Sequence, residues 1–315
     1  MKVLLAEKRD AAQDICVFEF VSPDGAPLPA FAAGAHIDVN LADGLVRQYS
    51  LCNAPGDTGC YRIAVLRDPA SRGGSIAMHA LQPGTQVEIS EPRNKFPLDP
   101  DATHSVLVAG GIGVTPIIAM AEHLAACGAS FELHYCTRSP ERTAFADRLA
   151  EQDLWPHARL YHDVDPPERR IDLRHVVATP ASGKHLYVCG PAGFIDAVLT
   201  SAKSAGWRDD HLHREYFAAP AQPAAACSSF QVRLHSSGQA IDVAENQTIV
   251  QALAAHGIEI QTACEQGVCG TCLTRVVDGE PEHRDSYLTD DERAANNQLL
   301  PCCSRSRSSV IVLDL

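Results

Sequence analysis

Hydrophobic and polar residues alternate in short stretches over the first hundred residues of the chain. Residues 36–41, 61–66 and 86–90 (HIDVNL, YRIAVL and QVEIS) show the two-residue period of strands with one buried face. Glycine and proline turns separate these stretches at even intervals. The pattern predicts a small antiparallel β-barrel over residues 1–100.

Residues 101–222 follow a different pattern, in which apolar runs alternate with stretches of helical period. The runs are SVLVAG, FELHYC, ARLYH and HLYVCG, and the helical stretches include TPIIAMAEHLAAC and AGFIDAVLTSAKSAG. Alternating strands and helices favour a parallel sheet with helices on its faces. We therefore predict an α/β domain that begins near the proline- and acid-containing stretch at 96–105.

An Ala/Pro-rich stretch at 218–229 lacks any period, and we place an interdomain linker at 223–229. Beyond it, FQVRLH and QAIDV alternate as the strands of a hairpin do. Thr248 and Gln251 have the spacing of a capping box that begins a helix, and Gly257 would end that helix. A compact α+β domain is expected over residues 230–315, which makes this a multidomain protein.

Composition fits this division, because 315 residues exceed what one ordinary core supports. Charged residues make up 21% of the chain, and no apolar run approaches the roughly 18 residues of a membrane helix. The first residues lack the pattern of a signal peptide. A net charge of −13 disfavours nucleic acid and anionic membranes as partners. We expect a cytoplasmic monomer that binds neither.

Three of the twelve cysteines, Cys264, Cys269 and Cys272, have the spacing C-x4-C-x2-C, and Cys302 follows after 29 intervening residues. This spacing is typical of a plant-type [2Fe-2S] cluster held by four thiolates. Zinc is the alternative, but zinc clusters usually use two C-x2-C-like pairs, and one such pair is present. We predict an iron–sulfur cluster with these four metal ligands.

The loop between these cysteines must turn sharply and aim backbone N–H groups at the sulfurs. Gly267 and Gly270 permit such turns without a Cβ penalty. Cys303 adjoins Cys302 and stays open as an alternative fourth ligand. We prefer Cys302 because its spacing fits the pattern.

A second set of candidate residues lies at the end of a strand in the first domain. Arg47 can hold a phosphate, Tyr49 can stack on a flavin ring, and Ser50 can bond the ring edge near its reactive nitrogen. The motif is short and would recur by chance. The stretch SRGGS at 71–75 adds backbone N–H groups for a second phosphate contact. Together they favour a flavin nucleotide.

In the second domain, the strand SVLVAG runs into GGIGVTP at 110–116, and a helix follows. Such a turn lets a pyrophosphate approach the backbone, with Pro116 expected at the first helical position. The residues CGP at 189–191 follow another strand, where open α/β sheets bind ligands. Arg138 lies where an adenosine ribose would be recognised. It could pair with the extra phosphate of NADPH, and the choice between NADH and NADPH stays open at this point.

The order of these motifs, RQYS, GGIGVTP, CGP and the terminal cysteines, resembles that of the phthalate dioxygenase reductase family, which includes vanillate O-demethylase reductases. The resemblance covers essentially the whole chain. Members carry an FMN barrel, a nicotinamide domain and a terminal ferredoxin domain, in that order. The resemblance therefore implies FMN, and it favours NADH.

The resemblance also assigns contacts residue by residue. It implies Ser50, Cys189 and Phe217 as catalytic residues, with Phe217 covering the flavin face. The implied flavin contacts are Arg47, Tyr49, Ser50, the strand from Val65 to Arg67, Gly74 and Ser75. The implied nicotinamide contacts are Gly111, Thr115, Arg138, Cys189 and Pro191.

By this resemblance, NADH delivers a hydride to the flavin, which passes single electrons through the cluster to a Rieske-type oxygenase acting on an aromatic or similar substrate. The oxygenase and its substrate are not specified by the sequence. Residues 230–315 contain six arginines, no lysine and twelve acids, so we expect an acidic docking face. The alternatives are a non-enzymatic flavin and iron–sulfur redox sensor, and a free-standing flavin reductase for which a cluster would be superfluous.

Overall fold

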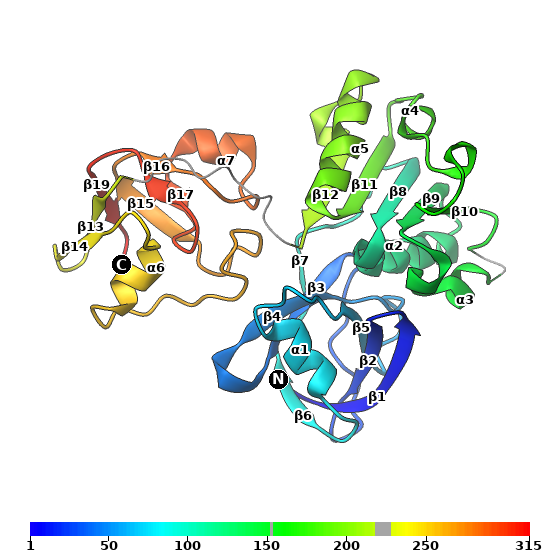
Figure 1. Cartoon of the computed structure of the whole chain (residues 1–315), viewed down its shortest axis with the longest axis horizontal. Helices are drawn as coiled ribbons and strands as arrows, with labels where there is room; N and C mark the ends of the chain where they lie inside the picture. Colours follow the sequence, from blue (N-terminus) through cyan, green and yellow to red (C-terminus); the bar gives the residue numbers. More distant parts are fainter. Residues whose placement is uncertain (152–153, 218–227) are drawn as a thin grey trace. The chain divides into compact units, whose positions relative to one another are not determined.

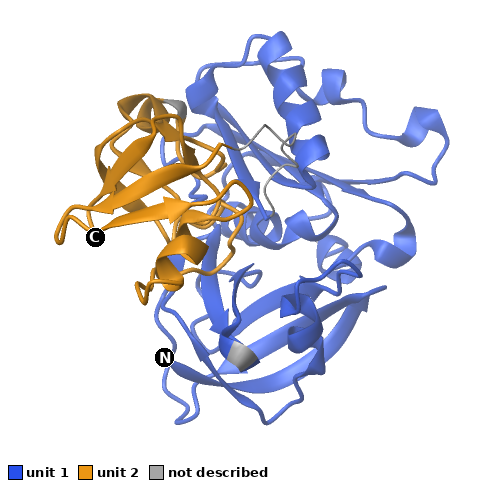
Figure 2. Ribbon diagram, turned by 60° about the vertical axis from the view of Figure 1, so that its left-hand side comes forward, with its two compact units in different colours: residues 1–217 blue, residues 218–315 orange. Residues whose placement is uncertain are grey.

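The computed structural model describes residues 1–151, 154–217 and 228–315. The chain divides into two compact units, residues 1–217 and 218–315 (Figure 2). Most of the predicted linker at 223–229 lies outside the described residues. None of the helices in the described part of the chain has the length and apolar character that a membrane crossing needs.

The first unit begins with a seven-stranded antiparallel sheet (Figure 1). Its order is β4-β3-β6-β1-β2-β5, and β7 pairs with β3. An isolated bridge between Leu51 and Ile63 joins the chain after β4 to β5, the strand at the opposite end of this order. Helix α1 (Gly74–Ala80) follows β5. The strands are β1 (Lys2–Ala12), β2 (Ile15–Val21), β3 (Ala35–Asn40), β4 (Val46–Ser50), β5 (Tyr61–Leu66), β6 (Gln86–Ile89) and β7 (Arg93–Asn94).

The second sheet of this unit has five parallel strands in the order β10-β9-β8-β11-β12. They are β8 (His104–Gly110), β9 (Phe131–Thr137), β10 (Ala158–His162), β11 (Lys184–Gly190) and β12 (Leu212–Tyr216). The helices are α2 (Val114–Ala126), α3 (Ala146–Leu149), α4 (Leu173–Val176) and α5 (Ala192–Ser204). The strands and long helices lie within two residues of the stretches predicted for them, and β12 was not predicted.

Both faces of the parallel sheet are covered, which explains why its strands read as continuous apolar runs. Along β8, Val106 and Val108 belong to a core cluster with residues of α4 and α5. Leu107 and Ala109 face the other way, into a cluster with residues of α2. The prediction of a parallel α/β sheet is confirmed.

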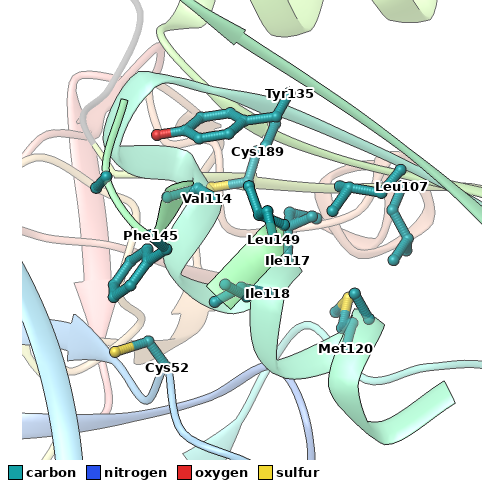
Figure 3. Packing of buried hydrophobic residues seen from close by; sticks show 14 of the residues in the cluster. Cys52, Leu107, Val114, Ile117, Ile118, Met120, Tyr135, Phe145, Leu149 and Cys189 are labelled. Carbon is teal, nitrogen blue, oxygen red and sulfur yellow. The ribbon is translucent and has the colours of Figure 1, made fainter. Parts of the chain in front are cut away.

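The second of these clusters also contains side chains from the antiparallel sheet (Figure 3). Cys52, from the loop after β4, packs with Phe145 and Leu149 near α3. Arg148 adds a polar contact, because its Nη2 donates to the Cys52 carbonyl at 2.8 Å and its Nε to Glu122 at 2.9 Å. A shared core therefore joins the two sheets into one compact unit.

The second unit has a mixed sheet in the order β14-β13-β19-β15-β17 and a small pair of β16 and β18. Its strands are β13 (Phe230–Leu234), β14 (Ala240–Val243), β15 (Thr274–Asp278), β16 (Pro281–Glu282), β17 (Gln298–Leu299), β18 (Arg305–Ser306) and β19 (Val310–Leu313). The helices are α6 (Ile249–Ala254) and α7 (Asp290–Ala295). The predicted hairpin is present as β13 and β14.

The helix start predicted at Thr248 is confirmed in detail. The Thr248 hydroxyl accepts from the Gln251 N–H, and the Gln251 side chain accepts from the Thr248 N–H, which is a complete capping box. Regular helix ends at Ala254, three residues before Gly257, whose φ is +76°. Gly257 thus ends the turn after the helix rather than the helix itself.

Candidate functional site

The glycine-rich turn lies at the carboxyl end of β8, beside the carboxyl end of β11. The two strands are paired neighbours, with Cys189 opposite Ala109. The chain leaves β8 toward β9 on one side and later returns to β11 on the other. This is the topological switch point at which open α/β sheets bind ligands.

The glycines of this turn serve two different purposes. A Cβ on Gly113 would lie 2.4 Å from the carbonyl of Cys189, so Gly113 allows α2 to pack closely on β11. Gly111 has a φ of +54° and open space where its Cβ would be. Gly111 therefore leaves the backbone accessible to a ligand, whereas Gly113 serves packing.

The helix after this turn begins two residues before Pro116, the residue predicted as its first. Val114 is its first residue, so Pro116 occupies the third helical position rather than the predicted first. The N–H that proline lacks is still one of those without an intrahelical partner. Thr115 is buried, and its hydroxyl donates to the Ile112 carbonyl at 3.1 Å.

Two other predicted nicotinamide contacts lie at the same edge of the sheet. Arg138 is exposed directly after β9, and Pro191 is exposed at the N-cap of α5. Cys189 differs from them, because its thiol is fully buried in the core shared with α2. Burial raises the pKa of Cys189 well above its usual value, and the nearby Glu215 raises it further.

Ser50, at the end of β4, reaches the parallel sheet of the same unit. Its hydroxyl lies 3.4 Å from Oε2 of Glu215 on β12, and Glu215 is paired with Cys189. Burial raises the pKa of Glu215 to about 8, against a smaller lowering by the Ser50 hydrogen bond. Two residues predicted as catalytic, Ser50 and Cys189, thus lie next to a half-buried carboxyl group whose raised pKa favours its neutral form.

Arg47 and the Gly73–Gly74 pair, predicted separately as phosphate contacts, lie together. A Cβ on Gly74 would lie 2.6 Å from the Arg47 side chain, and Arg47 donates to the Arg72 carbonyl at 3.1 Å. Tyr49 is two residues along β4, and burial raises its pKa. A guanidinium, a phenol and a hydroxyl therefore line one strand, which is a donor set suited to a flavin nucleotide.

The remaining predicted flavin contacts have varied surroundings. Val65 points into the core of the antiparallel sheet, and its carbonyl lies 2.9 Å from Nε2 of His79. Arg67 is exposed, and the Ser75 hydroxyl accepts from the Asp68 N–H at 3.2 Å. Phe217 follows β12 and is 39% exposed. Phe217 is thus a large aromatic side chain without a complete cover in its own unit.

The four predicted ligand thiols of the second unit face one another. Cys264 contacts Cys269 and Cys302, and hydrogen bonds from these two thiols lower its pKa. A hydrogen bond from Cys302 likewise lowers the pKa of Cys272. The same contacts raise the pKa values of Cys269 and Cys302. The four sulfurs are therefore close enough to be held by one cluster. The donor set therefore fits a [2Fe-2S] cluster.

The backbone of this loop is shaped as the two glycines predicted. Gly267 and Gly270 have φ values of +72° and +74°. The N–H of Gln266 points at the Cys264 sulfur (3.3 Å), and the N–H of Thr271 points at that of Cys269 (3.4 Å). Such N–H contacts stabilise negative charge on cluster sulfurs.

The turn at 302–303 brings two thiols near the loop. Cys302 is buried and contacts both Cys264 and Cys272. Cys303 is half-buried, and its sulfur lies 2.4 Å from the position of a Cβ on Gly267. Cys302 therefore has the contacts expected of the fourth ligand, and Cys303 packs against the loop from the side.

Sequence reasoning missed two features of the site. Glu215 lies in β12, a strand that the sequence did not predict, so no local signal marked this acid. The ring of Tyr287 lies where a Cβ on Gly270 would be, so the tyrosine covers that turn of the loop. No local pattern marks such a contact.

Comparison with known families agrees with this site. Residues 232–307 match the 2Fe-2S iron-sulfur cluster binding domain, and residues 89–212 match the DmmA-like N-terminal domain of a dimethylamine monooxygenase subunit. A 2Fe-2S domain joined to a dinucleotide-type sheet defines an electron-transferring oxidoreductase.

Whole-length relatives specify the family. The chain is 53% identical to vanillate O-demethylase oxidoreductase from Pseudomonas sp. strain HR199, over 100% of both chains. It is 40% identical to phthalate dioxygenase reductase from Burkholderia cepacia, over 100% of this chain and 97% of the relative. A solved phthalate dioxygenase reductase, described as a modular structure for electron transfer from pyridine nucleotides to [2Fe-2S], matches with a TM-score of 0.77 and 40% identity, over 100% of this chain and 98% of that one. The chain belongs to this family of oxygenase-system reductases, as its motifs suggested.

Proposed function

We propose that this protein is the reductase component of a Rieske-type oxygenase, carrying electrons from NADH through FMN and a [2Fe-2S] cluster to a separate oxygenase. The observation that carries the proposal is the contact between Ser50 and Glu215. It joins the strand with the flavin-type donors to the sheet edge with the glycine-rich turn. A nicotinamide and a flavin bound at these two places would be neighbours.

The antiparallel sheet is proposed to close into an FMN-binding β-barrel. The Leu51–Ile63 bridge and the hydrogen bond from the Cys52 N–H to the Arg62 carbonyl (2.8 Å) support closure between its end strands. Three domains, 1–100, 101–222 and 230–315 with a linker at 223–229, remain our division of the chain.

Within the barrel, we propose that Arg47 and Gly74 with Ser75 hold the FMN phosphate. Tyr49 and Ser50 would contact the ring, together with the strand from Val65 to Arg67. Because the Val65 side chain is in the core, its contact would be through the backbone. Phe217 would cover the flavin ring face, and the nicotinamide would displace its side chain on binding. The exposure of Phe217 in its own unit agrees with this role.

For the nicotinamide coenzyme, Gly111, Thr115, Cys189 and Pro191 are the proposed contacts. Arg138 would lie near the adenosine ribose, and we propose NADH rather than NADPH. Asp163 supports this choice, because its N–H donates to the Thr137 carbonyl (3.0 Å), beside the Arg138 turn. We propose that the Asp163 carboxylate faces the adenosine ribose, where it would disfavour the 2′-phosphate of NADPH.

When bound, the flavin supplies the conversion of a two-electron hydride into single electrons, and the cluster carries them one at a time. The residues of this chain orient the bound groups and shield them from solvent. Ser50 can donate a hydrogen bond toward the ring edge, and the protonated Glu215 keeps that hydroxyl in place without adding charge. In the second unit, Cys264, Cys269, Cys272 and Cys302 are the proposed ligands.

The acceptor is proposed to be a basic patch on an oxygenase acting on an aromatic or similar substrate. Leu273, next to the ligand Cys272, is 39% exposed, and the surrounding domain is acidic. An apolar contact on an acidic domain would bind a basic surface. We also propose that the protein acts as a monomer in the cytoplasm.

The test is reconstitution of turnover with purified oxygenase components. With NADH, the protein should support O-demethylation of vanillate by a vanillate oxygenase component more efficiently than dihydroxylation by a phthalate oxygenase, because vanillate reductases share up to 53% identity with it. Turnover should fall as ionic strength rises from low values. Failure to reduce either oxygenase, or a flat salt response, would contradict the proposed partner or the acidic docking face, respectively.

A further inference from the structure

A cluster of two imidazoles and one carboxylate lies at the amino ends of β11 and β12, at the opposite edge of the sheet from Cys189 and Glu215. His185 is the second residue of β11, and His213 is the second residue of β12. Asp99 comes from the segment between β7 and β8, which connects the two sheets of the first unit. Three separate stretches of chain meet at this place.

The ligand atoms of these three side chains converge. Nδ1 of His185 lies 2.9 Å from Nε2 of His213 and 3.8 Å from Oδ2 of Asp99, and all three atoms lie within 4.8 Å of one another. Ligand atoms about 2.0–2.1 Å from a tetrahedral zinc ion are themselves about 3.3 Å apart. Rotations of the side chains that bring these separations to about 3.3 Å would place all three atoms around one ion.

Neighbouring groups fix the orientation of the Asp99 segment. The other carboxylate oxygen of Asp99, Oδ1, accepts from the Asp101 N–H at 2.8 Å, which leaves Oδ2 facing His185. The Asp99 N–H donates to the Tyr187 hydroxyl at 2.8 Å. Such outer contacts orient ligands and raise metal affinity.

The two imidazole rings are held by stacking. His211 stacks on His185 with ring centroids 4.4 Å apart, and Tyr187 stacks on His213 at 4.5 Å. The His185 side chain is only 7% exposed, whereas that of Asp99 is 32% exposed. The cluster is thus preorganised, and it is open to solvent on the Asp99 side, where an ion could enter and keep a water ligand.

We propose that Asp99, His185 and His213 bind one divalent transition-metal ion, with zinc as the best match, and that this ion fastens the connector before β8 to β11 and β12. Two imidazole nitrogens and one carboxylate oxygen suit zinc and disfavour calcium or magnesium, which prefer oxygen ligands alone. The site is separate from the flavin, nicotinamide and cluster sites, and it does not depend on the function proposed above.

A competing explanation of the short contact between His185 and His213 is a hydrogen-bonded imidazole pair without a metal. The two explanations differ in what Asp99 contributes. A metal needs its carboxylate as a ligand, whereas the imidazole pair does not. Asp99→Asn separates them, since the amide keeps Oδ1 as an acceptor for Asp101 but replaces the charged oxygen that faces His185.

The experiment is calorimetric titration of Zn²⁺ into the chelator-treated protein with its flavin and cluster bound. All proteins carry Cys127→Ser, because the exposed Cys127 thiol lies 3.9 Å from Nε2 of His123 and could bind zinc itself. Asp99→Asn and His213→Gln are compared with His175→Ala. This control removes an exposed histidine on α4, a helix that packs on the same sheet. Unchanged flavin and cluster absorbance shows that each variant is folded.

One zinc ion should bind per chain in the parent and in His175→Ala, and the Kd should rise at least about tenfold in Asp99→Asn and His213→Gln, since loss of even an outer partner of a ligand costs about 10–100-fold. A zinc-edge anomalous signal in crystals should lie between the three side chains. Absence of stoichiometric binding in the parent, or equal Kd values in all four proteins, would overturn the metal site and leave the imidazole pair.

Discussion

The thiol loop of the second unit and the contact between Ser50 and Glu215 in the first unit position their reactive groups by opposite means. Three of the four thiols stand within nine residues, and glycines at positive φ aim them inward. Ser50 and Glu215 are 165 residues apart in the chain and meet only because two sheets share one hydrophobic core.

This difference determines how the activity of each site responds to single substitutions. Chemistry in the thiol loop depends on the identity of single residues, so one substitution should remove it completely. Chemistry at the Ser50–Glu215 contact depends on packing as well, so substitutions there should produce graded losses. The four predictions below test that contrast.

The largest effect is expected for the fourth ligand. Cys302→Ser should abolish assembly of the native cluster, because Cys302 contacts both Cys264 and Cys272. Cys303→Ser should retain the cluster, since Cys303 packs beside the loop. Iron content and the electron paramagnetic resonance spectrum of the reduced protein measure both outcomes. Loss of the cluster in Cys303→Ser with retention in Cys302→Ser would reverse the assignment.

A smaller effect is expected where packing supports the nicotinamide turn. Gly113→Ala should destabilise the first unit by about 1–3 kcal/mol, because the added Cβ overlaps the backbone of Cys189 and α2 must shift. Gly193→Ala is the matched control, since nothing lies within 4 Å of its Cβ position. The two unfolding midpoints in urea measure the difference. Equal midpoints would show that the turn does not require close packing.

The protonated Glu215 should make the stability of the first unit depend on pH. Its pKa rises from 4.5 in an unfolded reference to about 8 in the folded chain, so the folded state binds the proton more tightly. Its contribution is complete below about pH 4.5 and is lost as pH rises toward 8. Glu215→Gln should remove this loss, seen as a smaller fall in unfolding temperature between pH 5 and pH 8. A wild-type slope equal to that of the variant would contradict a neutral Glu215 carboxyl in the folded chain.

The smallest effect is expected at Ser50. Ser50→Ala removes one hydrogen-bond donor, and flavin reduction by NADH should slow about tenfold, equivalent to about 1.4 kcal/mol. The NADH concentration for half-maximal rate should change little. Ser90→Ala, which removes a hydroxyl bonded to Asp38 on the same sheet, is the control and should leave the rate unchanged. Anaerobic stopped-flow absorbance measures both, and equal rates in both variants would exclude Ser50 from the reacting site.

Much of the fold followed from local patterns. The strands of the parallel sheet read as apolar runs because helices cover both faces, and the capping box at Thr248 marked its helix start to the residue. With Pro116 as its first residue, the start of α2 was placed two residues late, because the glycine turn continues directly into the helix as a short 3-10 segment at Gly111–Gly113.

The candidate site was predictable where a motif or a fixed spacing marks its residues. Spacing alone indicated the thiol loop. Glu215 escaped notice because its importance comes from a strand pairing with β11 and a contact with Ser50 across two sheets. Likewise, the sequence did not show which glycine of the turn serves packing, since this depends on how closely α2 approaches β11.

The central claim is that electrons enter the first unit and leave through the thiol loop. Cys269→Ser tests it most directly, when the loaded protein is mixed anaerobically with NADH and then with the oxygenase. Flavin reduction should proceed at the wild-type rate, while reduction of the oxygenase should stop. Reduction of the oxygenase at an unchanged rate would show that electrons leave the protein by another route.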